Sequence, residues 1–86
     1  MTKRKKIIER FRENPKSVRF EEMEIMLLSL GFEKRNTGSS HFVFKHVDYP
    51  VIRITVPFKK PFIGAVYVRQ VLEQLEQYGV LDDLLD

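Results

Sequence analysis

The chain has 86 residues, the size of one small domain, since domains typically hold about 50–200 residues. It is 43% hydrophobic, which suffices for one compact core and is too apolar for intrinsic disorder. Cysteine is absent from the sequence, which excludes a disulfide framework, a thiolate nucleophile and cysteine-ligated metal sites. No apolar run approaches the roughly 18 residues of a membrane span, and the basic N-terminal stretch lacks the apolar core of a signal peptide. We therefore expect a cytoplasmic protein.

The net charge of +3 is distributed unevenly along the chain. Residues 1–19 carry eight Lys or Arg against two Glu, and residues 20–33 carry four Glu without a base. Residues 34–60 carry six Lys or Arg against one Asp. This central basic segment favours contact with a polyanion, and a solvated lysine-rich surface is the simpler alternative.

Two helices are predicted in the first third of the chain. Residues 3–13 form a short amphipathic helix, which Pro15 ends because the residue before a proline avoids helical geometry. Apolar side chains over residues 20–30 recur at helical spacing. Ile25 and Leu28 widen that apolar stripe, so we expect this helix to be covered on much of its circumference.

Three strands are predicted next, over residues 32–36, 41–45 and 51–56. Within residues 41–45, Phe42 and Phe44 share one face, because successive side chains of a strand point to opposite sides. The same alternation predicts that three polar side chains lie together on the outer face of an antiparallel sheet: His41, Lys45 and Arg53.

A final helix is predicted over residues 65–78, with a buried stripe made of Val68, Val71, Leu72, Leu75 and Tyr78. The order of elements predicts a two-layer α+β domain, α-β-β-β-α, with a three-stranded antiparallel sheet and its helices on one face. We interpret residues 1–16 as a basic helical extension and residues 17–86 as the domain.

Few residues of this sequence suit metal or hydrolase chemistry. His41 and His46 are the two histidines, and with Asp48 they fall short of the three or four ligands of a usual metal site. A triad of Ser39 or Ser40 with His41 and Asp48 is conceivable, although adjacent residues of a turn and a strand rarely point at each other. A phosphate cradle at residues 38–40 is a weak alternative to an ordinary turn.

His41 is the strongest catalytic candidate. Imidazole can accept and then donate a proton near neutral pH, and RNA carries its own nucleophile in the 2′-OH. A ribonuclease therefore needs little beyond one proton carrier and positive charge near the phosphate. The alternative is an ordinary surface histidine.

Four segments of the chain resemble one known family. They are residues 27–33 (LLSLGFE), 38–46 (GSSHFVFKH), 54–57 (ITVP) and 67–72 (YVRQVL). Together they are similar to the HicA toxins, the small ribonucleases of HicA–HicB toxin–antitoxin pairs, over about residues 20–79. Where family members often carry a histidine after the proline matched by Pro57, this chain has Phe58 and Lys59.

The resemblance implies a double-stranded-RNA-binding-domain fold and a metal-independent endoribonuclease that acts on mRNA. It places the catalytic histidine on His41, and it implies no metal, no small-molecule cofactor and a HicB-type antitoxin as the protein partner. The side chains expected to contact RNA are Lys34, Arg35, Ser39, Ser40, Lys45, Arg53, Lys59 and Lys60. A non-catalytic RNA-binding module of the same fold, and a module that docks an acidic protein, are the alternatives.

Overall fold

The structure is a computed structural model that describes residues 3–36, 38 and 40–79. This part of the chain contains three α-helices, one short 3-10 helix and three strands. Their bounds are α1 Lys3–Glu13, η1 Pro15–Ser17, α2 Phe20–Ser29, β1 Phe32–Asn36, β2 His41–His46, β3 Arg53–Pro57 and α3 Ala65–Gln77. The arrangement confirms the predicted α+β class, with an α-β-β-β-α order preceded by an additional helix.

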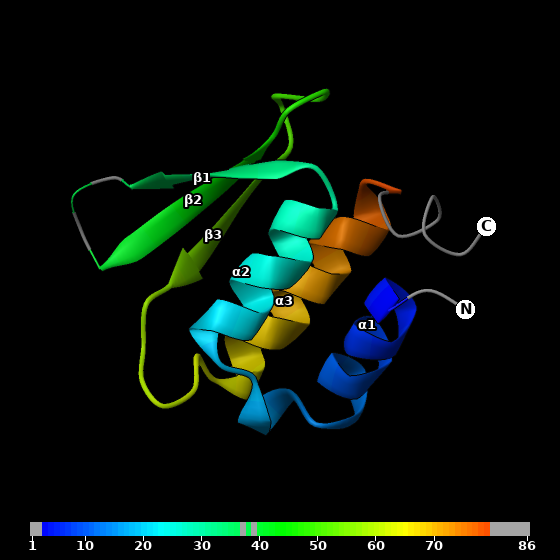
Figure 1. Cartoon of the computed structure of the whole chain (residues 1–86), viewed down its shortest axis with the longest axis vertical. Helices are drawn as coiled ribbons and strands as arrows, with labels where there is room; N and C mark the ends of the chain where they lie inside the picture. The colour runs from blue at the N-terminus through cyan, green and yellow to red at the C-terminus, as the bar shows by residue number, and fades with distance from the viewer. Residues whose placement is uncertain (1–2, 37, 39, 80–86) are drawn as a thin grey trace.

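The strands form one antiparallel sheet in the order β1-β2-β3, and the helices all lie to one side of it (Figure 1). On that inner side, Phe44, Ile54 and Val56 are fully buried and form the sheet's part of the core. The register assigns the other side of the sheet, here called the outer face, to Glu33, Arg35, His41, Val43, Lys45, Arg53, Thr55 and Pro57.

The start and end of α2 have local causes. The Glu22 carboxylate accepts a hydrogen bond from the Arg19 backbone N–H at 3.1 Å, which satisfies one donor at the start of the helix. Gly31 follows the last turn with φ of +100°, a conformation that side-chain-bearing residues rarely adopt. The chain can therefore turn sharply from α2 into β1.

The expectation that α2 is covered on much of its circumference is wrong. Ile25 is 61% exposed and Leu28 is 45% exposed. The buried side chains of α2 lie on the opposite side of the helix: Phe20, Met23, Met26 and Leu27. The apolar side chains on the Ile25 side therefore remain in contact with solvent.

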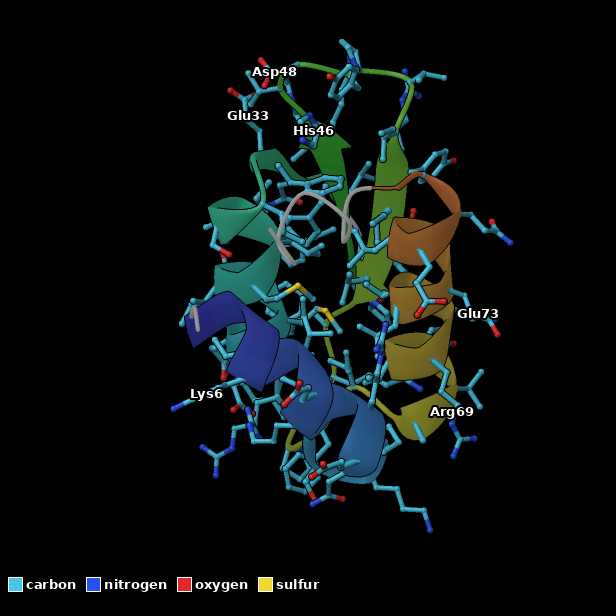
Figure 2. All side chains as sticks on the ribbon, turned by 90° about the vertical axis from the view of Figure 1, so that its right-hand side faces the viewer. Lys6, Glu33, His46, Asp48, Arg69 and Glu73 are labelled. Carbon is cyan, nitrogen blue, oxygen red and sulfur yellow. The ribbon has the colours of Figure 1, made fainter. Side chains whose placement is uncertain are left out.

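Helix α1 adds a further layer on top of α2 and α3, on the side away from the sheet (Figure 2). Its Ile8 and Phe11 side chains are buried in the same core cluster as the inner side chains of the other elements. Ion pairs join Arg10 to Glu22 of α2 and Arg12 to Glu76 of α3. The boundary predicted at residue 16 stays a prediction, but α1 shares the core of the domain.

The last helix and the last strand differ from their predictions at the ends. Val68, Val71, Leu72 and Leu75 are buried as expected, whereas Tyr78 is 46% exposed. Tyr78 is the C-cap of α3 and so lies beyond the packed part of the helix. The strand predicted from residue 51 begins at Arg53, because residues before it form a turn in which the Ile52 N–H donates to the Tyr49 carbonyl at 2.9 Å.

Candidate functional site

His41 begins β2 and is exposed on the outer face, as the alternation of β2 predicts. The two phenylalanines that follow it in alternate positions point to the other side, where the Phe20 ring lies 5.2 Å from Phe42 and 6.4 Å from Phe44 between centroids. Burial of these rings against α2 fixes which side of β2 faces the core. The imidazole is thereby held on the side of the sheet without helices.

Three of the predicted cations share the outer face with His41. Arg35 pairs with Val43, two residues from His41 along β2, so Arg35 is a diagonal neighbour of the histidine. Lys45 lies directly opposite Arg53 in the register of β2 and β3, and like charges opposite each other in a sheet are destabilising. Glu33 lies opposite Lys45 in the register of β1 and β2, and its carboxylate lies 3.4 Å from the Arg35 guanidinium, so one negative charge offsets part of the positive charge of this row. This row is a place where a phosphate would relieve charge repulsion.

Lys34, which was expected to contact RNA, does not share the outer face with the other cations of the sheet. Lys34 lies opposite Phe44 in the register of β1 and β2, so its side chain points to the helix side of the sheet. There its ammonium lies 2.6 Å from a carboxylate oxygen of Glu24 and 5.1 Å from the centroid of the Phe42 ring. Because Lys34 lies on the helix side and close to this carboxylate, it is a poor candidate for binding RNA phosphate on the outer face. Arg35 also lies near a carboxylate, that of Glu33 at 3.4 Å, but its more exposed side chain is on the outer face.

The remaining predicted cations lie in the segment between β3 and α3. The Phe58 N–H donates to the Ser40 carbonyl at 2.7 Å, which joins this segment to the residue before His41. The ammonium of Lys59 lies 5.1 Å from the Tyr67 ring centroid, and that of Lys60 lies 5.6 Å from the Phe58 ring centroid. Ser40 is exposed beside His41, whereas Ser39 lies outside the described residues.

His46 has a structural role at the far end of β2. Its Nε2 lies 3.1 Å from the Leu30 carbonyl, and its Nδ1 accepts the backbone N–H groups of Asp48 at 3.1 Å and Tyr49 at 3.2 Å. Both ring nitrogens are therefore engaged, with the proton on Nε2. The buried ring connects the end of α2 to the loop between β2 and β3.

The triad considered from the sequence is not assembled. His41 begins β2 and Asp48 follows two residues after its end, so a strand of six residues, about 17 Å from its first to its last Cα, lies between them. Figure 2 shows Asp48 pointing away from the molecule at the end where His46 lies. Within the described residues, no group of three or more His, Asp or Glu side chains could hold a metal ion.

Sequence reasoning missed two side chains near this site. Phe58 is 41% exposed at the end of the sheet that holds His41. Arg19 lines an open hollow together with Glu21, Lys60 and Pro61. The sequence held a local signal for Phe58, because this phenylalanine follows a predicted strand at once and precedes two lysines. Nothing local indicated Arg19, because it meets Lys60 only in the folded chain.

Comparison with known proteins identifies the family. The family model described as the HicA toxin of bacterial toxin-antitoxin matches residues 20–77, which include α2, the three strands and α3. The chain therefore belongs to the HicA toxin family, and membership implies a toxin–antitoxin partner. Helix α1 lies outside the matched span. No curated protein and no solved structure matches the chain. The helices that the structure describes are too short or too polar to cross a membrane.

Proposed function

We propose that this protein is a metal-independent endoribonuclease that cleaves mRNA in the cytoplasm and is neutralised by a HicB-type antitoxin. The observation that carries the proposal is the place of His41, exposed on a sheet face without helices and diagonal to Arg35. Membership of the HicA toxin family supports it independently.

In this proposal His41 is the general base. Its imidazole takes the proton of the RNA 2′-OH, and the 2′-oxygen then attacks the adjacent phosphorus. The bond to the 5′-oxygen breaks, the 5′-oxygen takes up a proton, and a 2′,3′-cyclic phosphate remains on the other fragment. Arg35 carries positive charge closest to His41 in the register and would stabilise charge that develops on the phosphoryl oxygens.

A non-catalytic RNA-binding module is the second candidate. The observation in its favour is that both nitrogens of His46 are engaged, so no second imidazole is available to protonate the leaving 5′-oxygen while His41 acts as the base. Binding would then depend on phosphate contacts and shape alone. The two candidates differ in whether His41 is needed for chemistry.

The deciding experiment uses end-labelled RNA with EDTA. We expect the unmodified protein to cut RNA, and His41→Ala to remain folded without cutting. Gln70→Ala, an exposed change on α3, is the matched control and should cut normally. A DNA of the same sequence should bind through its phosphates without being cut, because it lacks the 2′-OH. Cleavage by His41→Ala at the normal rate would refute the assignment.

The antitoxin is expected to cover the outer face with acidic groups. Co-expression with the neighbouring gene product should give a complex and relieve growth inhibition. Because a basic face steers an acidic partner, Arg53→Glu should slow association, most clearly at low salt. Arg69→Glu is the control, since Arg69 is exposed on α3 on the helix side of the sheet (Figure 2). Equal effects of the two changes, or no complex at all, would contradict this part of the proposal.

A further inference from the structure

Phe58 lies next to His41 although the two are far apart in sequence. Pro57 pairs with His41 across β2 and β3, and the next residue, Phe58, donates its N–H to the Ser40 carbonyl at 2.7 Å. The backbone of Phe58 is thus fixed beside the first residues of β2. Its ring points to the helix side of the sheet, where it meets Phe20 and Phe42, so a strand held at His41 on the outer face reaches the ring by passing around this end of the sheet.

The ring of Phe58 is supported from the protein side and open to solvent. It meets the Phe20 ring edge to face, with centroids 5.0 Å apart and an interplanar angle of 68°. The centroid of the Phe42 ring lies 6.1 Å from that of Phe58. Even so, 41% of Phe58 is exposed, more than packing against the core would require. A ring positioned in this way is preorganised, so binding would not have to order it.

One cation lies over the exposed ring, and a second lines the adjoining hollow. The Lys60 ammonium lies over it at 5.6 Å from the centroid, so one face of the ring already accepts a group that approaches from solvent. Arg19 and Lys60 line the adjoining hollow with Pro61 and one carboxylate, that of Glu21. A solvent-exposed aromatic ring beside basic side chains is the combination by which proteins bind single-stranded nucleic acid.

We propose that Phe58 is a stacking platform for one base of single-stranded RNA, where the strand continues around the end of the sheet from a neighbouring phosphate that is cut at His41. Arg19 and Lys60 bind the backbone of the same strand where it crosses the hollow, and the Lys60 ammonium leaves the ring for a phosphate. The assignment of the neighbouring phosphate as the one that is cut rests on the proposed function; the stacking itself does not. Because every base has an aromatic face, the platform selects unpaired RNA over duplex and is tolerant of sequence.

Binding can be measured without cleavage by using 2′-O-methyl RNA, in which the nucleophile is blocked. Phe58→Leu keeps an apolar side chain against Phe20 and removes the aromatic face. We expect it to weaken binding to the single strand by about 5- to 150-fold, the range for removal of one base stack, and to leave duplex binding unchanged. Phe58→Tyr should restore affinity. Tyr78→Leu removes a similarly exposed ring at the C-cap of α3 and should bind the single strand normally.

A set of RNA strands with one abasic nucleotide at successive positions locates the stacked base. The unmodified protein should bind less tightly when the abasic nucleotide is at one particular position. At that position the abasic nucleotide should not weaken binding by Phe58→Leu any further, because the variant already lacks the ring. Normal single-strand affinity of Phe58→Leu, or equal losses for duplex and single strand, would overturn the platform. If that occurs while the unmodified protein cuts RNA, the proposed function still holds. A position-specific loss in a protein that does not cut RNA supports the platform and rejects the nuclease.

Discussion

The two histidines of this protein should respond in opposite ways to replacement by alanine. His46 is only 7% exposed, and its ring connects three backbone groups: the Leu30 carbonyl and the N–H groups of Asp48 and Tyr49. It also meets the Phe32 ring edge to face, with centroids 5.0 Å apart. His46→Ala removes all of these interactions and leaves a void between the end of α2 and the sheet.

The expected loss of stability follows from these interactions. A neutral hydrogen bond contributes about 0.5–1.5 kcal/mol net, and an edge-to-face ring pair adds a further contribution of about 0.5–1.5 kcal/mol. The two N–H groups of the loop can turn to water, but the void left by the ring costs about 1 kcal/mol more, so we expect a total loss of about 2–4 kcal/mol. A domain of 86 residues has a free energy of unfolding of roughly 4–13 kcal/mol. At about 4–8 °C per kcal/mol, the midpoint of thermal unfolding should fall by roughly 10–30 °C.

Thermal unfolding followed by circular dichroism tests this contrast. His41→Ala removes an exposed side chain and should change stability by no more than about 0.5 kcal/mol. His46→Asn is the informative intermediate, because its amide oxygen can accept from the loop N–H groups without reaching Leu30. Below its unfolding temperature, His46→Ala should still cut RNA. An unfolding midpoint of His46→Ala within about 3 °C of the unmodified protein would refute the structural role of this ring.

Two further predictions follow from burial and from the sheet register. Phe11→Ala should lower the free energy of unfolding by about 3–5 kcal/mol, because Phe11 is fully buried, whereas Phe62→Ala should lower it by less than about 1 kcal/mol. Chemical denaturation of both variants measures the two losses. Equal losses would mean that α1 is not part of the core. Neutralising Lys45 or Arg53 should lower the slope of log affinity against log salt by roughly 0.7 for each phosphate of a single strand that the variant no longer neutralises. Lys34→Gln should leave that slope unchanged, and an equal drop would contradict its placement on the inner side.

Local chain geometry was enough to predict much of the site. The alternation of side chains along β2 is set by the pleat of a strand, so Phe42 and Phe44 on one face require His41 on the other. The same rule placed Arg53 outside once Ile54 was taken as buried. These predictions needed only the spacing of apolar residues, because the period of two is a property of the backbone within a few residues.

Other features were decided only by packing between distant segments. In β1 a single apolar residue, Phe32, marks the inner side, so the pattern was too weak to place Lys34, and Glu24 of α2 meets it there. The apolar spacing of α2 could not show that the Ile25 side of the helix lacks a covering element. His46 is a structural residue because its ring reaches a carbonyl 16 residues away in sequence, an interaction that exists only when α2 packs against the sheet. Spacing along the chain determines which face of an element is apolar, and tertiary packing determines whether that face is covered.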